Sequence, residues 1–158
     1  MSYLRLLSKA LPIAMIFAVT LIGSQLNAAS YTWTGNTSNA WGTATNWSPN
    51  GVPGSADNVT FDGSASNFTV SLTTARSVTT ILLSANYTFV MGGNIVTNNL
   101  SISDASTMAL ESGSGLLRIN TTLTLGSNCH LLGNGVSSVF LEMYGTTAMT
   151  DLTASIGS

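Results

Sequence analysis

Charged side chains are scarce in this sequence. Of its 158 residues, four are Lys or Arg and six are Asp or Glu, so 6% are charged, against about 25% in an ordinary soluble domain. Nucleic-acid binding needs clustered basic side chains that contact phosphates, and the sequence lacks such a cluster, which excludes that class of partner. Disorder driven by charge is excluded as well, because 44% of the residues are hydrophobic.

Cysteine and histidine are nearly absent. Cys129 is the only cysteine, so no intramolecular disulfide can form, and we interpret this residue as a small buried hydrophobic side chain. His130 is the only histidine, which makes a histidine-based catalytic triad or a multi-histidine metal site hard to build. We interpret it as a surface position in a strand. The sequence predicts no catalytic residue, no cofactor and no metal ligand.

Helix-forming patterns are also missing. No segment after residue 30 carries a sustained apolar stripe at the 3.6-residue spacing of a helix, so we expect essentially no helix there. From Asp62 onward, short apolar stretches alternate with Ser, Thr, Asn and Gly, as in residues 68–72 and 139–143. Alternation over three to five residues between turn-forming residues predicts short β-strands.

Residues 1–29 have the composition of a secretory signal peptide. Arg5 and Lys9 precede a largely apolar run over residues 10–23, and the segment ends in small residues. The run is shorter than the ~20 residues that span a membrane, so we expect no stable span once the signal is removed. We favour cleavage after Ala29, with cleavage after Ala28 as the alternative. The protein is therefore expected to be secreted or displayed at the cell surface.

The chain after residue 62 repeats. Residues 100–102 align with residues 123–125 at an offset of 23, and a similar strand, turn and strand begins about 20 residues earlier, at residue 78. Such repeats predict an all-β parallel β-helix, or β-solenoid, of about four short coils. Apolar side chains would form its core, with Ser, Thr and Asn outside and at the corners. An antiparallel β-sandwich is the alternative, since it also consists of short strands and frequent turns.

An aromatic passage precedes the repeats and contains all three tryptophans. Its spaced elements are Trp33-Thr34-Gly35, Trp41, Asn46-Trp47, Gly51-Val52-Pro53 and Asp57-Asn58-Val59-Thr60-Phe61. This order resembles the opening of bacterial secreted and surface β-helix proteins of the autotransporter-passenger type, with their associated β-strand repeats. The resemblance implies a right-handed parallel β-helix with this passage at its amino-terminal end. It brings no catalytic residues with it.

A solenoid needs such a passage, because its open end exposes apolar interior and unpaired strand groups. We expect Trp33, Trp41 and Trp47 to cover the first coil. Pro49 and Pro53 are expected to end strand pairing at the edge. Asp57 is expected to accept backbone N–H groups in its own turn. The alternative is that the tryptophan rings face outward as a platform on which sugars stack.

The predicted organisation is a signal peptide over residues 1–29, a cap over 30–61 and solenoid coils over 62–158, as the opening part of a longer protein. The carboxylates of Asp104, Glu111, Glu142 and Asp151 are interpreted as solvated surface groups, because the repeat brings no pair of them together.

The function that the sequence favours is an exported structural or adhesive β-solenoid without catalysis. It would make multivalent contacts with surface glycans or other proteins, and it could self-associate through an uncapped carboxy-terminal end. The alternative is a carbohydrate-binding module, or a fragment of a polysaccharide-active β-helix enzyme.

Overall fold

The computed structural model describes residues 27–111, 113–134, 140–143 and 146–148. Nearly all of its elements are short strands. In chain order they are β1 (Ser30–Trp33), the 3-10 helix η1 (Ala44–Asn46), β2 (Trp47–Ser48), β3 (Asn58–Phe61), β4 (Thr69–Leu72), β5 (Arg76–Leu83), β6 (Tyr87–Met91), β7 (Ile95–Ile102), β8 (Thr107–Glu111), β9 (Leu116–Leu125), β10 (His130–Asn134), β11 (Phe140–Met143) and β12 (Thr146–Ala148).

The near-absence of helix is confirmed for this part of the chain. Among the described residues, no helix has the length and apolar character needed to cross a membrane. The predicted signal peptide lies outside the described residues as far as residue 26, as do Asp151 and the carboxy-terminal end expected to be uncapped.

The strands form two sheets. The first has the order β11-β9-β7-β5-β3-β1-β2, with β12 also paired to β9, and the second has the order β10-β8-β6-β4. Every strand pair is parallel except β1 with β2. The chain alternates between the two sheets and moves one level along with each turn. The β-solenoid is thus confirmed, and the antiparallel sandwich is wrong because neighbouring strands run in the same direction.

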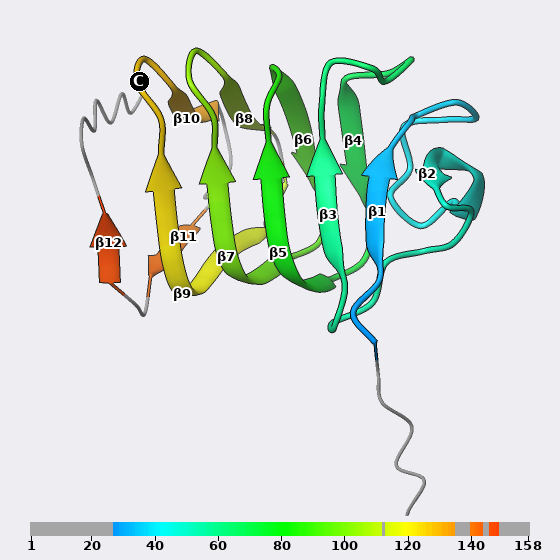
Figure 1. Ribbon diagram of the computed structural model, residues 1–158, viewed down its shortest axis with the longest axis horizontal. Helices are drawn as coiled ribbons and strands as arrows, with labels where there is room; N and C mark the ends of the chain where they lie inside the picture. Colours follow the sequence, from blue (N-terminus) through cyan, green and yellow to red (C-terminus); the bar gives the residue numbers. More distant parts are fainter. Residues whose placement is uncertain (1–26, 112, 135–139, 144–145, 149–158) are drawn as a thin grey trace, which may run out of the picture.

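The coil is right-handed. In Figure 1, strands of the first sheet run upward, the chain crosses behind them at the top, and each later strand lies further left. Right-handed crossovers are the rule between parallel strands. From the level of β3 and β4 to that of β9 and β10 the chain makes about three turns over four levels.

The register agrees with the repeat found in the sequence. Leu100 pairs with Leu123 and Ile102 with Leu125, which is the predicted offset of 23. Between β5 and β7 the offset is shorter, since Ile81 pairs with Leu100. The coils differ in length because their corners do and because the register between β7 and β9 shifts by one residue between Thr97 and Asn99. The strands still keep the same faces inward.

The core follows the two-residue alternation of the strands. Its side chains come from matching positions on successive levels, so they stack into columns. In the first sheet these columns include Val59, Ile81, Leu100, Leu123, Phe61, Leu83 and Ile102, and in the second sheet Val70, Phe89, Leu110, Leu72 and Met91, all at most 3% exposed.

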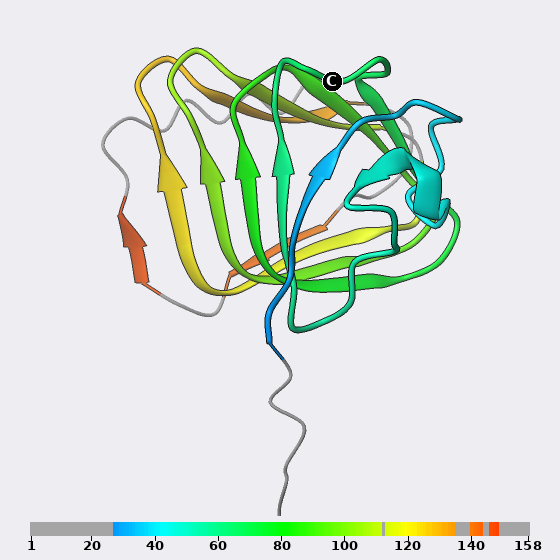
Figure 2. The same cartoon turned by 45° about the vertical axis from the view of Figure 1, so that its right-hand side comes forward.

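Strands β5, β7 and β9 bend in the middle, as Figure 2 shows. The alternation breaks at the bend, where Asn98 and Asn99 are adjacent and neither is buried, while the preceding Thr97 is 1% exposed. The Thr97 hydroxyl lies 3.2 Å from the Thr79 carbonyl oxygen and 3.0 Å from that of Asn99, so its proton has an acceptor inside the bend.

The bend divides the outer side of the first sheet into two faces. We name the part after the bend the front face and the part before it the lower face.

Backbone hydrogen bonds between levels continue through the corner after each front strand. Ser84 donates its N–H to the Phe61 carbonyl, Ser103 to Leu83 and Gly126 to Ile102, over 2.8–2.9 Å. Side chains add further bonds. Asp104 Oδ1 accepts from the Ser127 N–H at 2.7 Å, and Asn86 Oδ1 from the Thr107 N–H at 2.8 Å. The predicted use of small polar side chains at the corners is confirmed.

The aromatic passage covers the amino-terminal end of the stack. Trp33, Trp41 and Trp47 are 0%, 0% and 3% exposed. Their ring centroids lie 5.7–6.2 Å from that of Phe61, and Phe61 in turn lies 5.1 Å from Phe89 in the second sheet. The expected covering of the first coil by the tryptophans is confirmed.

The cap also covers the strand edges. β2 pairs with β1 in antiparallel fashion and ends at Ser48, directly before Pro49, as expected. On the other sheet, Ala40 bridges to Ser71 of the edge strand β4. One difference from the predicted boundary is that β1 pairs in parallel with β3, so the first sheet already starts within the segment expected to be only a cap.

Asn46 holds the cap loop together from inside. It is 0% exposed, and its Oδ1 accepts the N–H groups of Thr37 and Ser38 at 2.9 Å each. Its Nδ2 donates to the Ala40 carbonyl at 2.8 Å and to the Ser38 hydroxyl at 3.0 Å. All of its hydrogen-bonding capacity is therefore directed at one loop.

Replacing Asn46 with Ala should destabilise the protein by roughly 1–3 kcal/mol, because it leaves two N–H groups and a carbonyl in a partly buried loop without their partner. Urea denaturation measures the change. The matched control is Asn50→Ala at an exposed position, which should stay within about 0.5 kcal/mol of the parent. Equal effects of the two substitutions would contradict this role of Asn46.

Ala105 adopts a left-handed backbone with φ 55°, at the corner position that Asn128 occupies one level on, also with φ 55°. A β-carbon is costly there, whereas Asn tolerates it. Ala105→Gly should therefore raise the free energy of unfolding by roughly 0.5–1 kcal/mol. Ala109→Gly in β8, where the backbone is extended, should lower it. A loss of stability in Ala105→Gly would refute the strain at this corner.

Candidate contact surface

The front face carries two outward rows of side chains, one residue from each strand in each row. Neighbouring strands in a sheet lie about 4.8 Å apart, so side chains in each row repeat at that interval. The first row is Ser30, Asn58, Thr80, Asn99 and Thr122, and the second is Thr32, Thr60, Leu82, Ser101 and Thr124. Figure 1 shows the five strands that carry them side by side.

Nine of these ten side chains are uncharged hydrogen-bonding groups, and none of the ten is buried. The exception is Leu82, which is 45% exposed in the middle of the second row. Within the first row, Asn99 Nδ2 lies 3.5 Å from the Thr80 hydroxyl oxygen. The front face is thus an ordered array of hydroxyl and amide groups with one apolar side chain at its centre.

The charged side chains of the described residues lie elsewhere. Glu111 is on the second sheet, Asp104 is at a corner, and Arg118 and Glu142 are on the lower face. Asp57 and Asp62 come directly before and directly after β3, outside both rows. Arg76 is half-buried, with its guanidinium against Gly42 of the cap. The front face is therefore neutral because of where the charges sit, and not only because they are few.

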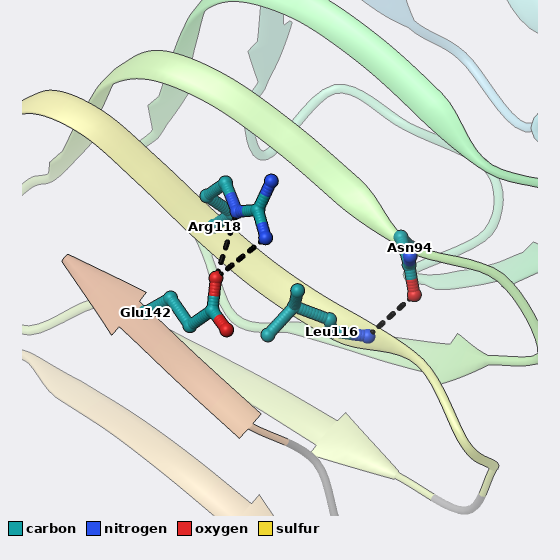
Figure 3. Close-up of polar contacts among 4 residues, drawn as sticks. All are labelled: Asn94, Leu116, Arg118 and Glu142. Atoms are coloured by element: carbon teal, nitrogen blue, oxygen red, sulfur yellow. Dashed lines mark hydrogen bonds and ion pairs between the residues drawn. The ribbon is translucent and has the colours of Figure 1, made fainter. Parts of the chain in front are cut away.

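Arg118 and Glu142 form an ion pair across two levels of the lower face (Figure 3). Glu142 Oε2 lies 2.7 Å from Arg118 Nη2 and 2.8 Å from Nε. In the same view, Asn94 Oδ1 accepts the Leu116 N–H at 2.9 Å, so side chains link three successive levels here. Both charged side chains are 38% exposed. This exposure limits the strength of the pair.

The carboxylates of Asp104, Glu111 and Glu142 lie on separate elements. Asp104 is exposed at a corner, as the repeat predicted, and its Oδ1 accepts the Ser127 N–H. Glu111 lies on β8 and Glu142 on β11. Among the described residues, no group of three or more His, Cys, Asp or Glu side chains is placed to hold a metal ion.

The three tryptophans do not form a sugar-binding platform. Each indole is buried in the core, and two of their N–H groups donate to backbone carbonyls, Trp33 to Asn67 and Trp47 to Trp41, at 2.8 Å. A ring packed on both sides presents no face to a sugar. The alternative in which sugars stack on Trp33, Trp41 and Trp47 is therefore wrong.

Cys129 and His130 occupy positions close to those expected. Cys129 is partly buried and packs against the hydrophobic core, and His130 is exposed in β10, where it pairs with Thr107. Tyr87 is also buried, and its hydroxyl donates to the Asp62 carbonyl at 2.7 Å. Burial, and then the charge of Asp62, raises the pKa of Tyr87 well above its ordinary value, so the hydroxyl stays protonated as a donor.

A family model described as "Domain of unknown function (DUF8693)" matches residues 32–132, and the chain belongs to this family. The matched segment runs from β1 to β10, so it includes the aromatic cap together with the coils. No curated protein and no solved structure matches the chain.

The contribution of the Arg118–Glu142 pair can be measured with a double-mutant cycle of Arg118→Met and Glu142→Gln. The expected coupling is about 0.2–1 kcal/mol, because both partners are partly solvated. It should shrink when the salt concentration is raised from about 0.1 M to about 1 M, since the Debye length falls from about 10 Å to about 3 Å. A coupling of zero at low salt would show that the pair does not stabilise the lower face.

Proposed function

We propose that this protein is an exported structural or adhesive β-solenoid that acts at the cell surface or outside the cell, without catalysis. The observation that carries the proposal is the front face, where uncharged hydrogen-bonding side chains recur on five consecutive strands. Each contact of this kind is weak. A rigid row of them binds through effective concentration, because the first contact holds the others within reach of the same surface.

The partners that fit this face are uncharged polar surfaces, namely glycans or other proteins. A strongly charged partner would find no opposite charge on the front-face rows. Leu82 offers an apolar contact at the centre of the array, where interfaces gain most of their binding energy. The leader over residues 1–29 and the resemblance to surface β-helix proteins support the exported location.

Carboxylates placed on the front face should abolish multivalent contact. In the full chain, the double variant Ser101→Glu with Thr124→Glu should lower retention on surfaces coated with neutral polysaccharide or with protein by at least tenfold. Each contact that is lost lowers the effective concentration at which the remaining contacts form. The matched control is the double variant Ser77→Glu with Ser114→Glu, which adds the same charge at two exposed sites outside the front-face rows. Retention on immobilised surfaces is measured directly.

Equal retention of the front-face variant and the parent would contradict the proposal. Polysaccharide breakdown by the parent that is lost in Glu111→Gln or Asp104→Asn would contradict it in another way, since it would make the protein an enzyme.

A further inference from the structure

Ala29 is the point at which the chain joins the first sheet. Its N–H donates to Asp57 Oδ1 at 2.9 Å, and its carbonyl accepts the Asn58 N–H at 2.8 Å. Residues 27 and 28, just before it, are exposed. The boundary between exposed chain and chain bonded to the sheet therefore falls at the Ala28–Ala29 peptide bond.

Asp57 is held in place as an acceptor for this nitrogen. Its Oδ2 accepts the Gly54 N–H at 2.7 Å, and its own N–H donates to the Gly54 carbonyl at 3.1 Å, so the turn fixes the carboxylate from both ends. Among the described residues, Asp57 has no basic side chain within ion-pair distance. A half-buried carboxylate directed at a backbone nitrogen is well placed to bind a positive charge at that nitrogen.

We propose that the leader is removed between Ala28 and Ala29, and that the new α-ammonium group of Ala29 pairs with the Asp57 carboxylate. The proposal rests on the export proposed above. Hydrolysis consumes one water molecule, leaves a carboxylate on Ala28 and releases the amino group of Ala29, which takes up a proton. The N–H donor to Asp57 then becomes a charged donor, and such bonds are roughly twice as strong as neutral ones.

Cleavage one residue later, which the sequence alone favoured, would remove this interaction. A chain beginning at Ser30 lacks both the Ala29 nitrogen bound by Asp57 and the Ala29 carbonyl bound by Asn58. The amino-terminal strand β1 would then start without either anchor. The structure thus gives a reason for retaining Ala29 that signal-peptide composition does not contain.

The first test is amino-terminal sequencing and intact mass of the protein recovered outside a bacterium that expresses the full chain. The expected first residue is Ala29. A processed chain that begins at Ser30, or at any other residue, overturns the proposed site and leaves export intact. A chain that stays unprocessed inside the cell overturns both the site and the proposed export.

The second test concerns the ion pair and uses the mature protein. Lys9 is the only lysine in the sequence, so after processing the α-amino group is the only amine, and an amine-specific reagent acetylates it alone. Acetylation should lower Tm by about 2–4 °C by removing the charge. In Asp57→Asn the same treatment should cause no shift, whereas Asp62→Asn, a control that keeps Asp57, should respond like the parent. Equal shifts in the parent and in Asp57→Asn overturn the pairing.

Discussion

Phe61 is the residue on which the architecture depends most. Its ring contacts the three tryptophans of the cap on one side and Tyr87 and Phe89 of β6, one level further along the stack, on the other. Aromatic pairs at these separations contribute roughly 0.5–1.5 kcal/mol each beyond their buried area. A parallel stack has no hairpin to start it, so its first level needs a partner that is not another coil. The cluster around Phe61 supplies that partner.

Once the aromatic cluster covers the first level, the remaining levels follow from the alternation of inward and outward side chains along each strand. Each strand places every second side chain inward, and parallel pairing puts equivalent residues directly above one another. The same geometry that stacks Ile81 on Leu100 in the core stacks Thr80 on Asn99 outside. The hydrophobic core and the front face are therefore two consequences of one register. A shift by one residue would exchange them.

The sequence predicted the parts of the fold that depend on local pattern. The 23-residue offset, the polar corners and the covering tryptophans are all readable from spacing and residue type. The bend in β5, β7 and β9 was not predicted, because it arises where Thr97 buries its hydroxyl inside the turn of the strand. The anchoring of Ala29 by Asp57 was not predictable either, because it joins residues 28 positions apart in the sequence. The orientation of the tryptophans depends on packing from several elements, such as the bond of Trp33 to Asn67, 34 positions further on. The front-face rows were implicit in the repeat, and aligning its outward positions would have found them.

The unequal corners have a consequence for how such a chain changes over generations. The corner between β5 and β6 spans residues 84–86, whereas the one between β7 and β8 spans 103–106, and the strands on either side still pair in register. An inserted or deleted codon at a corner therefore alters only a loop, while the same event within a regular part of a strand inverts every side chain that follows it in that strand. The bend also accepts an extra residue, since the register between β7 and β9 shifts by one between Thr97 and Asn99 and the later pairs still match. Natural variation in length should accumulate at the corners, and whole coils can be duplicated or lost as units without disturbing the surface presented by their neighbours.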